Sequence, residues 1–534
     1  MSFEKKTKAI ANKIRNFTTE SLVENLLKRL HADYDGPTGM ERAWVTCMLL
    51  EWVLENKPKS TARVAQPKDV YKLTNDIWNL QGDATASAVG SESLMLSMRP
   101  FLLTQLRFQQ PQIIHAYFLV RLYSIMVSVN ESPAFKNSFK QATNVELDRF
   151  YSLSLLLIQL FANTKSVYLP YKDMLTNFHP AFSVDEIAAI LSALGANVGD
   201  LKAHFRERRL TLGAIKKAEY CAETHLTRYP LLLLPDSLTT SHTYVASIGV
   251  SEFVLRTLKA IDPSGFRNKF SRAFEDYMGQ VFQDFGIPVI HESLLNDHYK
   301  KNGLQGKVVD FLLNSNGRSV LFDAKGVEPR DELLTTDSPK TIKDKLRDTL
   351  LKGVEQAAKC STLLDSSNYP NFADYSHRFA LIVTHKEFYF GGGPQLADYL
   401  REYSDDKLLD VVSGCIPLEN IHFCSIAELE GITAICTKSG TSIPDFLQYC
   451  TEQNQDSVTA KFEMRQQLES FIKECDMEHG APIGSQQVYQ DYETLMNEGQ
   501  QAIAESKQYW REGGTDKALE YLQKLAQLKG KLSS

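Results

Sequence analysis

Apolar residues recur at three- and four-residue spacings through roughly the first 215 residues, the pattern of helices with one buried face. A piece rich in glycine, alanine and serine within Val64–Ser93 (GDATASAVGSES) is typical of a surface loop. The pattern predicts an N-terminal all-helical domain, with its clearest helices at Ser21–Leu30, Met40–Glu55, Ile113–Val129 and Val145–Phe161.

Two shorter helices are expected near the end of this region. Ser183 is a good N-terminal cap for DEIAAILSAL, and a glycine turn leads to a second helix near Asp200–Arg206. Such a pair has the layout of a helix-turn-helix, and basic residues that could touch phosphates follow: Lys202, Arg206, Arg208, Arg209, Lys216 and Lys217. A solvated helix face in a bundle is the simpler interpretation of this charge.

The pattern changes at about Arg228. The stretches RYPLLLLP and HTYVASIGV look like strands, and mixed helices and strands continue to about Ile435. Helical spacing returns after Pro444. The segments Gln486–Arg511 and Thr515–Leu528, joined by Gly513-Gly514, are expected to form a hairpin resembling one tetratricopeptide-like unit, which is more often a packing element than a peptide receptor.

A sharp signal lies in Val308–Gly326, VVDFLLNSNGRSVLFDAKG, which has two apolar strands around Asn316-Gly317. This dipeptide suits a two-residue type I′ turn, because both positions need a positive φ. With that turn, Leu313 pairs with Val320 and Asp310 lies opposite Asp323. Side chains alternate along a strand, so Lys325 shares a face with Asp323. Two carboxylates facing each other are destabilising unless a positive charge lies between them, and a divalent cation assisted by Lys325 would meet this need.

The elements around this hairpin follow an informative order. An amphipathic helix at Phe266–Phe285 carries Glu275, and Pro288–Leu295 is expected to be a first strand. After the hairpin, a long helix capped by Ser338 is expected to carry Lys345, Lys352 and Gln356 on one stripe. Two further buried strands are expected at Arg378–Thr384 and Ile421–Ser425.

Over roughly 266–435 the chain resembles the PD-(D/E)xK nuclease superfamily, which has the restriction-endonuclease-like fold. Asp310 matches the first acid of its motif, Asp323 the second, and Lys325 the lysine two residues on. Glu275 matches an additional helical glutamate, and Gln356 a glutamine that some members carry on the following helix. Val309 stands where the family name has proline, and the second acid is aspartate, as in other variants of the motif.

The resemblance implies a central α/β/α nuclease domain between two helical regions, with domains at 1–227, 228–440 and 441–534. It implies that Asp310, Asp323 and Glu275, with the Ala324 carbonyl, hold Mg²⁺ or Mn²⁺, hard ions that prefer oxygen ligands. Lys325 would position water or stabilise developing charge, with Gln356 also catalytic. Lys352 and Lys345 would contact nucleic acid.

Composition limits the remaining possibilities. The 534 residues are too many for one core, and a net charge of −6 means that affinity for nucleic acid must come from local patches. The eight cysteines have no zinc-site spacing and are expected to be free thiols in a reducing cytoplasm. No apolar run is long enough for a membrane span, and the N-terminus lacks the features of a secretion signal.

The sequence therefore predicts a cytoplasmic, Mg²⁺-dependent endonuclease that cleaves DNA, in restriction or antiviral defence by association with its family. The helical regions would gate the site, form homo-oligomers or bind a protein partner. Two alternatives stay open: a nuclease fold that binds nucleic acid or acts as a scaffold without cutting, and an RNase on the same fold.

Overall fold

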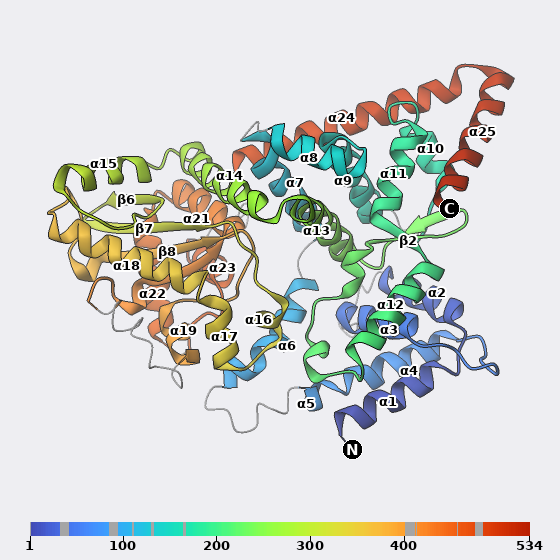
Figure 1. Ribbon diagram of the computed structural model, residues 1–534, viewed down its shortest axis with the longest axis horizontal. Coiled ribbons are helices and arrows are strands. Elements are labelled where there is room, and N and C mark those ends of the chain that lie inside the picture. Colours follow the sequence, from blue (N-terminus) through green and yellow to red (C-terminus); the bar gives the residue numbers. More distant parts are fainter. Residues whose placement is uncertain are drawn as a thin grey trace.

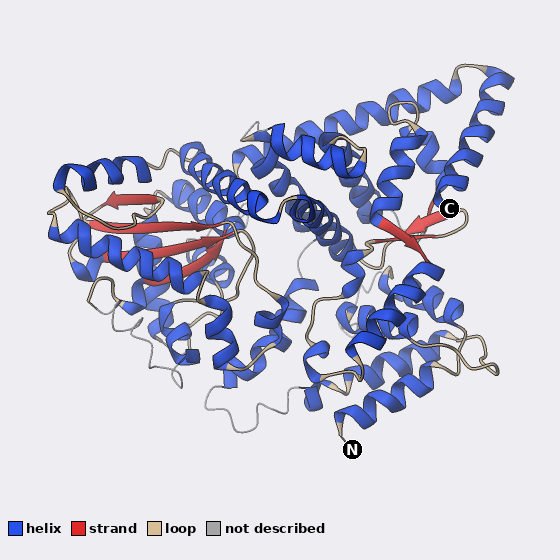
Figure 2. Ribbon diagram, viewed as in Figure 1, coloured by secondary structure: helices blue, strands red, loops and turns tan. Residues whose placement is uncertain are grey.

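The protein is mostly helical and contains two small mixed sheets (Figures 1 and 2). The computed structural model describes residues 2–32, 42–84, 94–108, 112–129, 133–163, 167–400, 412, 414–456, 458–475 and 484–533. No helix in these ranges has the length and apolar character to cross a bilayer. The loop expected at GDATASAVGSES begins inside a short helix, α5 (Gln81–Ala84), and its remaining residues lie outside the described ranges.

The first core forms around helix α3 (Ala43–Glu55), in which every residue after the first is buried. A helix that is apolar on all sides must be surrounded, and neighbouring helices cover it. The group comprises α1 (Phe3–Ile14), α2 (Thr19–Leu30), α3, α4 (Pro67–Trp78) and α12 (Val198–Leu212). The helices predicted at Ser21–Leu30 and Met40–Glu55 are thus confirmed within the described residues.

A second helical layer joins the C-terminal end of the chain to helices within 112–194. The predicted C-terminal hairpin is confirmed as α24 (Gln486–Arg511) and α25 (Gly514–Ser533), and it packs on helices from the N-terminal half (Figure 1). Gly499 of α24 lies so close to Leu156 that a Cβ would be 2.6 Å from Leu156 Cδ2. The hairpin therefore acts as a packing element. Its partners include α7 (Gln112–Tyr123), which continues into a π-helical turn at Ser124–Ser128, α9 (Leu147–Asn163), α10 (Tyr171–Phe178) and α11 (Val184–Leu194).

The expected helix pair at 183–206 exists as α11 and α12. Ser183 forms the predicted cap, with Glu186 completing a reciprocal capping box. Strand β2 (Gly195–Asn197) lies between the helices. Part of the basic run is used internally, because Lys202 pairs with Glu20, and both Arg208 and Arg209 pair with Glu55. These contacts favour the packing interpretation over phosphate contact.

The first sheet is small and has the order β1-β4-β3-β2. Its strands are β1 (Leu169–Pro170), β2, β3 (Leu231–Leu233) and β4 (Ser237–Thr239). The prediction of an all-helical region at 1–227 is therefore wrong in part, because β1 and β2 lie within it and pair with strands beyond residue 228. The strand expected in RYPLLLLP is confirmed as β3, but the one expected in HTYVASIGV is wrong. That stretch begins α13 (Thr243–Ile261), whose first half is buried on every side, so its apolar run carried no helical periodicity.

The second sheet has five strands in the order β5-β6-β7-β8-β9. The first three are antiparallel and the last three parallel. The strands are β5 (Ile290–His291), β6 (Phe311–Ser315), β7 (Arg318–Lys325), β8 (Arg378–Thr384) and β9 (Ile421–Ser425), and the last two have the predicted bounds.

Alternating side chains of this sheet enter two different cores. Val320 and Phe322 of β7 pack toward α14 (Pro263–Asp284) and α21 (Ile426–Ser439). Leu321 packs on the other face, toward α17 (Pro339–Leu346) and α18 (Leu350–Ser366). The sheet therefore lies between two helical layers, as Figure 1 shows.

Three expectations in this region are corrected. Pro288–Leu295 is only briefly a strand, because Glu292 already begins α15 (Glu292–Asn302). The long helix after the hairpin is two helices, α17 and α18, separated at Arg347–Thr349, where Thr349 departs from helical backbone angles. Ser338 caps α17 as expected, but the single stripe of Lys345, Lys352 and Gln356 does not exist.

Candidate metal centre

Three carboxylates from separate elements converge at the end of the β6–β7 hairpin away from its turn. Glu275 lies on α14, Glu292 begins α15, and Asp310 immediately precedes β6. One oxygen from each lies within 4.8 Å of the other two. Two of the three residues were predicted from sequence, and Glu292 was not.

The hairpin has the predicted register. Asn316 and Gly317 have φ angles of 53° and 72°, as a type I′ turn needs, and Leu313 pairs with Val320. The last ladder pair is Phe311 with Phe322, so the next residues in register are Asp310 and Asp323. The backbone N–H of Ala324 donates a 2.5 Å hydrogen bond to Asp310 Oδ2, which fixes this carboxylate beside β7.

The two glutamates are positioned by backbone contacts. The N–H of Glu292 donates a 2.9 Å hydrogen bond to the Asp310 carbonyl, so the start of α15 is tied to the start of β6. Helix α14 approaches the end of β7 closely, because a Cβ on Gly326 would be 3.2 Å from Ser271 Cα. That approach brings Glu275 to the end of the hairpin.

Asp323 lies at the bottom of the site and is fully buried. It forms an ion pair with Lys325, which is consistent with both residues facing one side of β7. Gly353 of α18 leaves the space for this carboxylate, since a Cβ there would be 2.8 Å from Asp323 Oδ2. No hydrogen bond from another described residue reaches either Asp323 oxygen.

The crowded carboxylates have perturbed acidities. Burial, reinforced by the charge of Asp323, raises the pKa of Asp310 to about 8. Burial also raises the pKa of Asp323, although Lys325 opposes the change. For Glu275, burial and then the charge of Glu292 raise the pKa. The site thus concentrates more negative charge than its surroundings stabilise, the electrostatic pattern of a cation site.

The other expected site residues lie around this centre. The Gln356 amide donates a 2.6 Å hydrogen bond to the Val308 carbonyl, so it supports the segment before Asp310. Lys345 is used in an ion pair with Glu332. Lys352 is exposed on α18, and its positive charge opposes the rise in the pKa of Asp323. Ala324 contributes its N–H to Asp310, and the expected contact of its carbonyl with a metal ion stays a prediction.

Glu292 escaped the sequence analysis because its stretch was interpreted as a strand. The spacing of apolar residues in ESLLNDHYKKN could have predicted a helix. Leu295 and Tyr299 are four residues apart, and both are buried. A helix starting at Glu292 would have placed an acid at the end of a strand, beside the hairpin acids.

The residues present fit a hard divalent cation. All candidate donors are carboxylate oxygens, the ligands that Mg²⁺ and Mn²⁺ prefer. A bound cation would offset the repulsion that raises the pKa of Asp310. Glu275, Glu292 and Asp310 are the closest set, and Asp323 with Lys325 lies next to them.

No family model, curated protein or solved structure matches this chain.

Proposed function

We propose that the protein is a metal-dependent endonuclease that hydrolyses phosphodiester bonds of DNA. The observation that carries the proposal is the convergence of Glu275, Glu292 and Asp310 within 4.8 Å of one another, next to Asp323. Lys325 adds an ammonium beside these carboxylates. Acids with one lysine at a strand end suit a reaction in which a phosphate accumulates negative charge.

The fold supports the same proposal. A helix with a glutamate precedes an antiparallel hairpin with the two aspartates, and two parallel strands follow beyond a helical crossover. This is the order that the resemblance to PD-(D/E)xK nucleases implies, with α15 and the break between α17 and α18 added. We therefore infer a restriction-endonuclease-like domain within 228–440, between helical regions at 1–227 and 441–534.

Each residue has a defined task in this proposal. Asp310, Glu275 and Glu292 would hold Mg²⁺ or Mn²⁺, with Asp323 available as a further ligand. The ion would supply Lewis-acid activation of water and neutralise charge on the phosphate. Lys325 stabilises the negative charge that develops on the phosphate, and its pairing with Asp323 holds it in place. Gln356 positions the Asp310 segment through Val308.

DNA is the proposed substrate. Lys352 and Lys307 are exposed lysines placed to meet it, because the positive charge of each acts on Asp323. The large helical regions suit control of cleavage through a protein partner or a second copy of the chain. Restriction or antiviral defence is the proposed setting, by family association.

A second candidate function is a nuclease fold that binds nucleic acid without cutting. The observation that favours it is the ion pair between Asp323 and Lys325, because both groups are already engaged with each other. In that case the protein would retain DNA but show no hydrolysis.

Purified full-length protein should be incubated with plasmid, linear and single-stranded DNA and with RNA, in Mg²⁺, Mn²⁺ or EDTA. Cleavage of DNA that needs the metal and is lost in Asp310→Asn and Lys325→Ala supports the proposal. Cleavage of RNA alone would point to an RNase. DNA retention without cleavage would establish the second candidate.

A further inference from the structure

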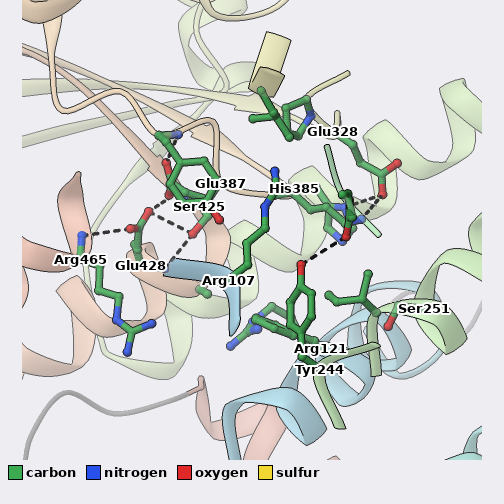
Figure 3. A pocket seen from close by; sticks show the side chains of 18 of the residues that line it. Arg107, Arg121, Tyr244, Ser251, Glu328, His385, Glu387, Ser425, Glu428 and Arg465 are labelled. Atoms are coloured by element: carbon green, nitrogen blue, oxygen red, sulfur yellow. Dashed lines mark hydrogen bonds and ion pairs between the residues drawn. The ribbon is translucent and has the colours of Figure 1, made fainter. Parts of the chain in front are cut away.

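A separate cavity of about 750 Å³ lies where the helical regions meet the five-stranded sheet (Figure 3). One wall is built from residues that follow the carboxyl ends of β7, β8 and β9, including Glu328, His385 and Glu428. In open sheets with parallel strands, ligands bind beside these strand ends. The volume is within the range of small-molecule sites and far exceeds that of a single phosphate ion.

The cavity is also lined by two arginines that have no ion pair with a described residue. Arg256 reaches the cavity from α13, and Arg107 from α6 (Leu94–Phe108). Burial lowers the pKa of Arg256; the charge of Glu252 opposes this change, and the charge of Arg228 adds to it. Nearby His225 is neutral, because burial and surrounding arginines lower its pKa to about 3. Glu223 acts on Arg107 and Glu252 on Arg256, but neither carboxylate forms an ion pair with them, so both guanidinium groups can bind an anion.

A different part of the wall consists of acids. Figure 3 shows Glu387 and Glu428 close together, on the side away from Glu328. Burial and the neighbouring charge of Glu428 raise the pKa of Glu387, and burial raises that of Glu463 to about 8. A protonated carboxyl both donates and accepts a hydrogen bond. Glu387 Oε2 is buried, and the neighbouring Glu428 carboxylate can accept a hydrogen bond from the protonated Glu387, so the two carboxyls form a pair on the cavity wall.

Aromatic side chains complete the wall. Tyr244 and Tyr389 line the cavity, and Tyr389 lies under the guanidinium of Arg107, whose carbon is 6.0 Å from the ring centroid. Tyr389 also has a φ of 57°, a backbone conformation that costs a bulky residue energy. Its N–H is held by Glu387 Oε1 at 2.6 Å. Strain of this kind is concentrated at ligand sites.

We infer that this cavity binds a nucleotide, with Arg256 and Arg107 holding the phosphates and the base lying toward the tyrosines and Glu387. A nucleotide combines the anion, the flat ring and the hydrogen-bonding edge that the three parts of the wall require. The site shares no residue with the metal centre, so the inference goes beyond the proposed nuclease activity and does not depend on it.

The test uses the full-length protein in EDTA, which keeps metal-dependent binding out of the measurement. Isothermal titration calorimetry is run with ATP, GTP, CTP and UTP, with the nucleoside of each, and with inorganic phosphate. At least one triphosphate should bind, and its nucleoside and inorganic phosphate should bind far more weakly. Arg256→Ala should weaken the binding by about tenfold or more, the usual consequence of losing a charged hydrogen-bond donor.

Arg256→Lys keeps the charge and should retain part of the affinity, which guards against a folding defect in Arg256→Ala. Arg511→Ala, an exposed arginine at the end of α24, is the matched control and should bind like the unchanged protein. The inference is overturned if no triphosphate binds, if the matching nucleoside or inorganic phosphate binds as tightly, or if Arg256→Ala leaves the affinity unchanged.

Discussion

Glu430 receives two hydrogen bonds from the guanidinium of Arg121, with Nε–Oε1 and Nη2–Oε2 distances of 2.8 and 2.9 Å. The two side chains are 0% and 6% exposed, so water cannot replace either partner. The pair joins α7 of the helical region to α21 beside the sheet. Tyr277, two residues after Glu275 on α14, donates a 2.7 Å hydrogen bond to the same carboxylate.

Glu430→Gln should destabilise the protein by about 3–5 kcal/mol, because it removes the buried carboxylate that pairs with the Arg121 charge. Tyr277→Phe removes a neutral hydroxyl that bonds this carboxylate and Ser485 Oγ, and it should cost less, about 1.5–3 kcal/mol. The midpoint of urea unfolding, compared between the two variants, measures both effects. Equal and small losses would mean that the ion pair does not hold the regions together.

Glu292→Gln should raise the Mg²⁺ concentration needed for half-maximal binding by about tenfold or more, since even outer residues of a metal site have effects of this size. The reason is its place among the three converging carboxylates. Asp297→Asn, on the same helix but exposed and paired with Lys300, is the control and should bind Mg²⁺ normally. Similar affinities in both variants would remove Glu292 from the site.

Metal binding should release a proton near neutral pH. Asp310 is largely protonated in the metal-free protein below its pKa of about 8, and a ligand must be ionised. Affinity for Mg²⁺ should therefore rise with pH from 6.5 to 8 and then level off. Calorimetry in two buffers of different ionisation enthalpy counts the protons. Binding that is independent of pH over this range would exclude Asp310 as a ligand.

Gly353→Ala should destabilise the protein by about 1–3 kcal/mol, the usual cost of overpacking a core. Its Cβ would come within 2.8 Å of Asp323 Oδ2 and 2.9 Å of Ile382 Cγ2, and neither neighbour has room to move away. Gly530→Ala is the matched control, because nothing lies within 4 Å of its Cβ. There the better helix propensity of alanine should stabilise by up to about 1 kcal/mol. Thermal unfolding of the two variants should shift in opposite directions.

Stability should fall as the pH rises toward 8 because of Glu463. Burial raises the pKa of this carboxyl to about 8, so the folded state favours the protonated form. The stability that comes from keeping Glu463 protonated is fully present below about 4.3, the pKa of this carboxyl in the unfolded chain. It is lost as the pH rises through about 8, the pKa in the folded protein. Glu463→Gln, which is neutral at every pH, should flatten the decline in urea midpoint between pH 5 and 8.5. An unchanged decline would assign it to other groups.

The sequence determined the local chemistry of the hairpin. Asn316-Gly317 determines the type of turn, and the turn determines the register of the two strands. That register places Asp310 opposite Asp323. Each step depends only on residues that are near one another in the chain. Caps were equally local, as Ser183 and Ser338 show. Periodicity found most helices but failed where all sides are buried, as at the start of α13.

Only the tertiary structure decided which distant groups share a site. Glu292 joins Glu275 and Asp310 because α15 begins where β5 ends, and Gln356 was turned to Val308 by the packing of α18. Tertiary packing also brought Lys345 into an ion pair with Glu332. The nucleotide-sized cavity has no sequence signature at all, since its walls come from segments more than three hundred residues apart. Their proximity follows from the packing of separate cores, which no local pattern encodes.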